Sequence, residues 1–137
     1  MTDRSAGTIS FINPAALAPP TGYSHVAEIR GGRLILIAGQ VAQDRQGNIV
    51  GLGDLAAQAE QVFDNLRAAL AGVGCTPANL AKLTVFVRDM KAVAAYRPAR
   101  DRFFAGTTPP AITLVEVSQL FREGLLLEIE AIAAAPA

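Results

Sequence analysis

The clearest hydrophobic periodicity in the chain predicts a helix over residues 54–73. Apolar side chains recur there every three or four positions, and polar side chains lie on other faces. The apolar set consists of Ala59, Val62, Phe63, Leu66, Leu70 and Val73. Asp54 is suited to cap the first turn and Gly74 to end the last one. We therefore expect an amphipathic helix that places one face on a core.

Three strand patterns precede this helix. Residues 8–12 predict a short strand, and a proline-rich loop follows it. Residues 24–30 and 33–38 predict two more strands, joined by Gly31 and Gly32 in a two-residue hairpin because glycine tolerates positive φ. The strand over 33–38 is apolar on both faces, so we expect both of its faces to be covered.

The second half of the chain predicts a strand, a helix and two further strands. Residues 80–88 alternate as a strand with one apolar face. Residues 89–104 predict a helix that Pro98 kinks or restarts, because proline lacks the amide donor. Residues 111–117 and 125–133 predict the last two strands.

These elements predict one α+β domain that spans residues 1–137. Two helices cover only one face of a sheet. We therefore expect a single mixed or mainly antiparallel sheet with both helices on one face. The other face carries apolar residues, which favours a closed oligomer that buries it.

Composition excludes several classes of partner. The chain has 137 residues, of which 51% are hydrophobic and 18% charged, and its formal net charge is zero. A neutral surface is poorly suited to nucleic acid, which needs a basic face. The single cysteine, Cys75, fits a reducing compartment, and no secretory or membrane-spanning pattern is visible. We expect a cytoplasmic protein that binds neither nucleic acid nor membrane.

Several motifs, in their joint order, resemble the Rid family, also called YjgF-type. The motifs are Thr21-Gly22-Tyr23-Ser24, Ile37-Ala38-Gly39-Gln40, Leu83 to Asp89, Phe103-Phe104, and the runs 109–117 and 125–133. The last two runs resemble a closing hairpin of that family. The resemblance covers residues 13–133 and implies a chorismate-mutase-like fold, a homotrimer with small-molecule clefts between subunits, and imine or enamine deaminase activity.

The resemblance also implies roles for four residues. Tyr23 would line the cleft, and Gly39 and Leu114 would touch the ligand through their backbones. Glu128 would orient or activate the attacking water. Three of them have a plainer interpretation: Tyr23 at a wet interface, Gly39 at a bulge, and Glu128 with Glu130 on an exposed or salt-bridged strand face.

Ile112 departs from the family pattern. Active members of the family carry an arginine at this position, and it anchors a substrate carboxylate. Isoleucine cannot form that bidentate ion pair, and drift after loss of function is one interpretation. Arg97 corresponds to an asparagine that, in the family, enters the cleft from a neighbouring subunit. Arg97 is therefore a candidate ligand-binding cation, and an exposed helix arginine is the alternative.

The other polar residues indicate no further chemistry. His25 is the only histidine, so neither a metal site nor a catalytic triad is predicted. It shares a predicted strand face with Tyr23 and is a further candidate to line the site. No phosphate loop or dinucleotide motif is present, so we expect no cofactor.

Four functions remain open at this stage. The first is a trimer that binds a small metabolite, not an amino acid, between subunits, with hydrolysis of a C=N bond as a further option. The second is a genuine 2-imino acid or enamine deaminase, against which Ile112 counts. The third is a non-catalytic binding or regulatory trimer. The fourth is the ribonuclease activity that gives part of the family its name, against which the neutral charge counts.

Overall fold

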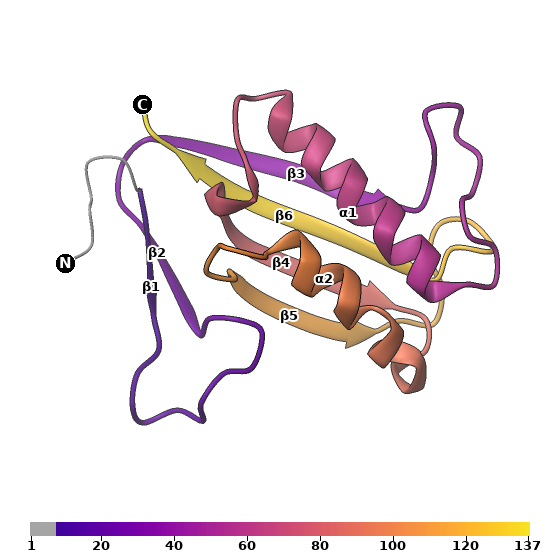
Figure 1. Ribbon diagram of the computed structural model, residues 1–137, viewed down its shortest axis with the longest axis horizontal. Coiled ribbons are helices and arrows are strands. Elements are labelled where there is room, and N and C mark those ends of the chain that lie inside the picture. Colours follow the sequence, from indigo (N-terminus) through magenta and orange to yellow (C-terminus); the bar gives the residue numbers. More distant parts are fainter. Residues whose placement is uncertain (1–7) are drawn as a thin grey trace.

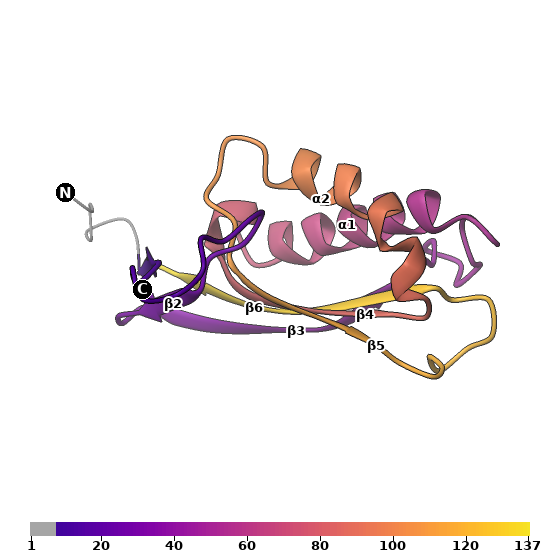
Figure 2. The same ribbon diagram turned by 90° about the horizontal axis from the view of Figure 1, so that it is seen from below.

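The computed structural model of the protein describes residues 8–137 as a sheet covered by helices on one side (Figures 1 and 2). Helices α1 (Leu55–Ala71) and α2 (Arg97–Phe103) lie across the same face of a four-stranded sheet. Strands β1 (Ile9–Ile12) and β2 (Val26–Ile29) form a separate antiparallel pair. The α+β class with two helices on one face is confirmed, but the strands form two sheets where we expected one.

The main sheet has the order β3-β6-β4-β5. Its strands are β3 (Arg33–Val41), β4 (Leu80–Val87), β5 (Ala111–Glu116) and β6 (Leu127–Ala135). The pairs are antiparallel except for β4 and β5, which run parallel. Because β4 lies between β5 and β6, the expected closing hairpin is wrong, and β5 forms an edge of the sheet.

The expected hairpin at Gly31 and Gly32 is also wrong. Both glycines have positive φ, 66° and 80°, but the turn leads from one sheet into the other. Strand β2 pairs with β1, whereas β3 pairs with β6. The nine-residue β3 finds an equally long partner in β6, and β2 has only four residues to offer. The longer ladder satisfies more backbone groups of β3.

Helix α1 follows the prediction closely. The Asp54 carboxylate accepts a hydrogen bond from Ala57 N at 3.1 Å, which caps the first turn. The C-cap is Gly72, two residues before the predicted stop. Gly74 still has a structural role there, because its φ of 73° turns the chain so that Cys75 N donates to Leu70 O.

The predicted second helix divides into two parts. Asp89 caps a short 3₁₀ segment, Met90–Ala95, through a hydrogen bond from Lys91 N. Helix α2 then begins at Arg97, with Pro98 in its first turn. An amide at that position would have no acceptor within the helix, so its absence in proline costs no helical hydrogen bond. Pro98 therefore restarts the helix, which is one of the two outcomes that we expected.

The face of the main sheet opposite the helices is left open in a single chain (Figure 2). Leu83, Val85 and Val87 point to the helix side of β4 and are fully buried. Leu34 and Leu36 point to the other side of β3 and are 63% and 73% exposed. Within one chain, residues 33–38 are thus covered on one face only.

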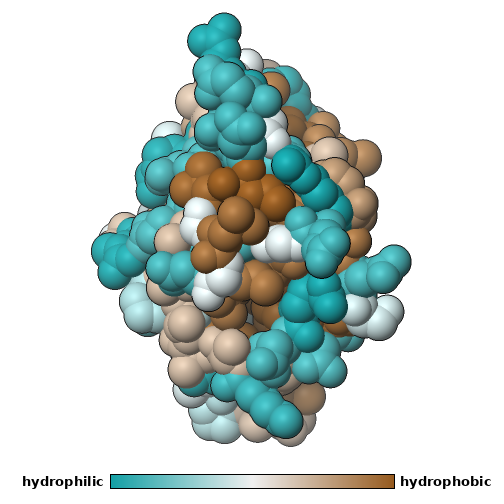
Figure 3. All heavy atoms as spheres, turned by 90° about the vertical axis from the view of Figure 1, so that its right-hand side faces the viewer, coloured by the Kyte–Doolittle hydropathy of each residue, from teal (hydrophilic) through white to brown (hydrophobic). Residues whose placement is uncertain are grey.

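Gln58 holds together the end of the molecule at which β3 leads into α1. The side chain is fully buried, and its amide nitrogen donates to Gly51 O and Gly124 O at 3.1 and 2.8 Å. Its amide oxygen accepts from Leu126 N at 2.8 Å. Apolar side chains gather on this end among hydrophilic ones (Figure 3). No helix in residues 8–137 is both long and apolar enough to cross a membrane.

Candidate functional site

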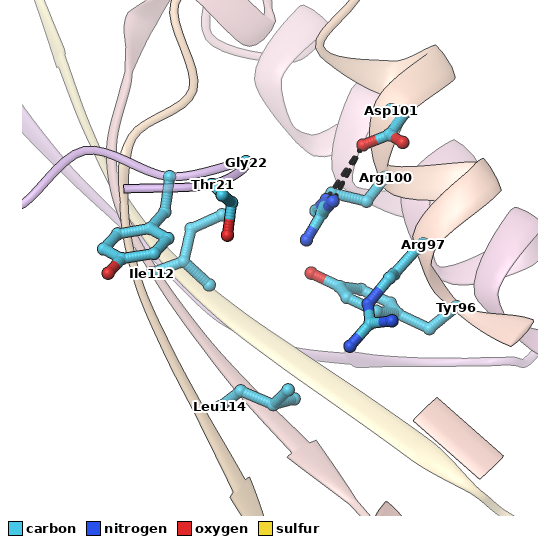
Figure 4. A pocket seen from close by; sticks show the side chains of 9 residues that line it. Thr21, Gly22, Tyr96, Arg97, Arg100, Asp101, Ile112 and Leu114 are labelled. Atoms are coloured by element: carbon cyan, nitrogen blue, oxygen red, sulfur yellow. Dashed lines mark hydrogen bonds and ion pairs between the residues drawn. The ribbon is translucent and has the colours of Figure 1, made fainter. Parts of the chain in front are cut away.

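A cavity of about 700 Å³ lies between α2, the edge strand β5 and the segment before β2 (Figure 4). Its lining consists of Thr21, Gly22, Tyr23, Tyr96, Arg97, Arg100, Asp101, Ile112 and Leu114. Strand β5 runs in register with β4, so that Ile112 is level with Leu83 and Leu114 with Val85. Both β5 side chains therefore point to the helix side of the sheet, where they form the apolar wall of the cavity.

The segment that carries Tyr23 is fastened to the start of β5. Ser24 N donates to Pro110 O at 2.9 Å, and the Ser24 hydroxyl donates to Pro109 O at 2.7 Å. His25 Nε2 donates to Ala18 O at 2.7 Å, and its ring meets the Tyr23 ring edge-on with centroids 5.2 Å apart. His25 therefore supports Tyr23 and does not itself line the cavity.

Arg97 and Arg100 place two guanidinium groups in the cavity (Figure 4). Arg100 pairs with Asp101, with Nη2 and Nε at 2.9 and 3.0 Å from Oδ1. Its guanidinium also packs against Gly22, where a β-carbon would lie 2.6 Å from Nη2. Arg97 makes no hydrogen bond or ion pair with any part of residues 8–137. The three side chains together leave the cavity with one positive charge in excess.

Tyr96 adds a buried hydroxyl to the helix side of the cavity. The residue is 2% exposed, and its hydroxyl oxygen finds no hydrogen-bond partner in the described part of the chain. Burial raises the pKa of Tyr96 to about 12, although the neighbouring Arg100 opposes the rise. The hydroxyl is therefore protonated at neutral pH and available as a donor. Burying such a group without a partner costs about 1–3 kcal/mol.

Gly39 and Glu128 meet at a second place. A β-carbon on Gly39 would overlap Glu128 Oε1 and lie 2.7 Å from the carboxyl carbon, so the carboxylate rests on the Gly39 backbone. The contact occurs where the β3–β6 register shifts between Ile37 and Gln40, so Gly39 also marks a strand irregularity. Burial raises the pKa of Glu128, and the charge of Glu130 adds to the rise.

One chain thus separates the predicted residues into two groups. Tyr23, Arg97, Ile112 and Leu114 line the cavity, whereas Gly39 and Glu128 are in contact elsewhere. Strand β4 lies between Ile112 and Glu128, and the two side chains point to opposite faces of the sheet. A single chain does not bring all six residues around one cleft.

The position of Arg97 corrects another expectation. We expected Arg97 to enter the cleft from a neighbouring subunit. It lines the same cavity as Ile112 of its own chain, because α2 packs beside β5. No second copy is needed to bring the two residues together.

The sequence and the fold match a known family. The sequence profile described as Endoribonuclease L-PSP matches residues 13–135. The chain belongs to this family, which is also called YjgF or Rid. The match includes every residue of the cavity and the contact between Gly39 and Glu128.

Several individual Rid-family proteins are similar to this chain over most of their length. A RutC family protein of Synechocystis is 37% identical over 130 residues, which cover 94% of this chain and 98% of that protein. The 2-iminobutanoate/2-iminopropanoate deaminase of Escherichia coli K12 is 34% identical over 123 residues, 88% of this chain and 90% of that one. The crystal structure of YyfB, a Rid-family protein of unknown function from Yersinia pestis, has a TM-score of 0.87 and 38% identity. The matched region covers 93% of this chain and 99% of the YyfB chain.

Tyr96 and Arg100 line the cavity but were not predicted from the sequence. The spacing of Arg97 and Arg100 was a usable signal, because residues three apart share a helix face. Arg102 breaks that pattern and pairs with Glu60 of α1, away from the cavity. In residues 8–137 no group of three or more His, Cys, Asp or Glu side chains could hold a metal ion.

Proposed function

We propose that this Rid-family protein binds a small metabolite in clefts between the subunits of a homotrimer, where it hydrolyses an imine or enamine C=N bond. The main support for this proposal is that the predicted site residues lie in two separate places within one chain. The cavity beside β5 holds cations and apolar side chains, and the Glu128 carboxylate lies on the other face of the sheet. A second copy that places its open face against the first cavity would unite the two groups. The similar deaminase of E. coli supports this choice of reaction.

Glu128 would prepare the attacking water. Its raised pKa makes the carboxylate a better proton acceptor than an ordinary glutamate. The water oxygen would bond to the imine carbon while the C=N electron pair moves to nitrogen. Glu128 would pass one proton of the water to the nitrogen, which gives a carbinolamine. It would then carry the remaining hydroxyl proton to the same nitrogen while the C–N bond breaks, so that ammonia leaves and a carbonyl forms. An enamine would first take a proton on carbon to become the imine.

Ile112 favours a second candidate function, a trimer that binds its ligand without hydrolysing it. The side chain belongs to the apolar wall of the cavity and offers no charge to a carboxylate on the β5 side. A genuine 2-imino acid deaminase would need a cation from elsewhere in the cavity.

A coupled assay tests hydrolysis directly. A dehydratase generates 2-aminoacrylate from serine, and pyruvate release is followed with and without the protein. We expect acceleration by the wild type, and a loss of about 10²–10⁴-fold in kcat for Glu128→Gln, typical of a lost general base. No acceleration by the wild type would overturn the deaminase proposal for this substrate. Acceleration by Ile112→Arg alone would support the non-catalytic candidate.

A further inference from the structure

We infer that the cavity between α2 and β5 binds a small monocarboxylate, whose carboxylate contacts Arg97 and Arg100 while its hydrocarbon part lies against Ile112 and Leu114. The inference rests on the proposed function in that it concerns the same cleft. In this arrangement the anion-binding groups lie on helix α2, and Ile112 of strand β5 contacts the apolar end of the ligand.

The charges of the cavity favour a monoanion. Arg97 has no counter-ion among the described residues, and Arg100 shares its charge with Asp101 at 2.9 Å. The Arg100 side chain is 18% exposed, so its guanidinium is partly desolvated and held close to the loop at Gly22. A carboxylate would balance the single excess charge, whereas a phosphate dianion would leave negative charge in a half-apolar space.

The Tyr96 hydroxyl gives a second, independent indication. It is buried, points toward the cavity and makes no hydrogen bond of ordinary geometry in residues 8–137, although the Arg100 guanidinium lies close to it (Figure 4). The neighbouring side chains close it off from solvent. Arg97 is long and has no partner that fixes it, so it can turn toward a ligand and open a path to the hydroxyl. A carboxylate oxygen at that place would accept the hydrogen bond that the protein leaves unmade.

The opposite wall indicates the other end of the ligand. Ile112 and Leu114 face α2 across the cavity and are partly buried against the core (Figure 4). Neither side chain can hydrogen-bond, so this wall favours a short hydrocarbon group. An acid with a branched chain of a few carbons combines both features.

Calorimetry on the full-length protein tests the ligand class with three probes: 4-methylpentanoate, the neutral 4-methylpentanamide and inorganic phosphate. We expect the acid to bind about tenfold or more tightly than the amide, because only the acid is charged. We expect phosphate to bind more weakly than the acid. No detectable binding of the acid, or equal affinity for acid and amide, would overturn the inference.

Variants on α2 locate the anion site. Arg97→Gln and Arg100→Gln are each expected to weaken binding of the acid by about tenfold or more while leaving the amide unaffected. Tyr96→Phe should weaken it by a smaller factor. Arg102→Gln removes a charge from the same helix outside the cavity and serves as the matched control. Unchanged affinity in Arg97→Gln would overturn the assignment.

These measurements separate the inference from the proposed function. Binding of the acid without any pyruvate release would leave the carboxylate site intact and overturn hydrolysis. Tight binding of the amide with no preference for the acid would overturn the carboxylate site and leave the small-molecule cleft intact.

Discussion

Glu128 links the stability of the fold to pH. Burial raises the pKa of its carboxyl group and Glu130 adds to the rise, so the folded state holds the proton more tightly than the unfolded chain does. The stabilisation is therefore fully present below the ordinary pKa of glutamate, and it is lost as pH rises through the raised value. Glu128→Gln cannot ionise, so we expect it to have a larger free energy of unfolding than the wild type at neutral pH.

Urea denaturation at neutral pH and at about pH 4, near the ordinary glutamate pKa, measures this effect. The gain in Glu128→Gln should shrink at the lower pH, where the carboxyl of the folded wild type is protonated and that of the unfolded chain is largely so. The exposed Glu123 supplies the control variant Glu123→Gln, which should change little. An equal gain for Glu128→Gln at both pH values would contradict the proposed link.

Gly39 provides a second test at the residue scale. Its φ is not in the left-handed region, so alanine strains no backbone there. The new β-carbon would instead take the place of the Glu128 carboxyl group. We expect Gly39→Ala to fold, to displace Glu128 in a crystal structure and to lower the proposed deaminase activity about tenfold or more, because small misplacements of catalytic groups are costly.

Gly72 supplies the matched control for that variant. A β-carbon there would lie 3.3 Å from the nearest atom, Ala69 O, and φ is −61°. Gly72→Ala should leave both activity and the position of Glu128 unchanged. A Gly39→Ala structure in which Glu128 keeps its place would show that β3 moves to make room.

At the scale of elements, Gln58 connects α1 to the loops that precede α1 and β6. Gln58→Met keeps the volume of the side chain but leaves Gly124 O and Leu126 N without their partner, whereas Gly51 O keeps the bond from Asp54 N. Each unpaired buried group costs about 1–3 kcal/mol, so we expect a loss of at least about 2 kcal/mol in the free energy of unfolding. Urea denaturation measures the loss.

Gln61 on the same helix gives the control. It is half-buried and makes one long hydrogen bond to Gln43 O at 3.4 Å and one to Asn65. Gln61→Met should cost less than about 1 kcal/mol, since these groups keep access to water. Similar losses in the two variants would mean that the three bonds of Gln58 do not hold the loops.

The predicted elements agree with the structure where the pattern reports local burial. The apolar period placed α1 within a residue or two, Asp54 caps it as predicted, and Pro98 restarts the second helix, which is one of its two predicted effects. Both predicted hairpins failed, because strand pairing depends on which distant strand offers the better ladder. The alternation within a strand predicts which side chains share a face, but it does not predict which strands pair with it.

For the whole molecule, the open face of the main sheet carries the proposal of a homotrimer. Leu36 is 73% exposed there, and a charge at its position would oppose burial against another copy. We expect Leu36→Glu to lower the molar mass in light scattering from the trimer toward the 14.3 kDa of one chain. It should also abolish activity if the cleft needs two copies.

Leu52 offers a matched control, since it is 71% exposed but lies in the connection between β3 and α1. Leu52→Glu should leave the molar mass unchanged. A wild-type protein that is monomeric at micromolar concentration would contradict the trimer. Equal dissociation of both variants would contradict the choice of face.

The sequence by itself determined the family, the order of the elements and the alternation that places Glu128 and Glu130 on one face of β6. These properties follow from residue identity and from local periodicity, which a chain carries whatever lies beside it. Only the tertiary structure decided that β4 separates β5 from β6 and that Ile112 and Glu128 face opposite ways. Only it placed Tyr96 and Arg100 in the cavity, because part of their surroundings comes from a segment more than seventy residues away along the chain, the loop at Gly22. Contacts of that kind are set by the free energy of the whole fold, to which the local pattern contributes only one part.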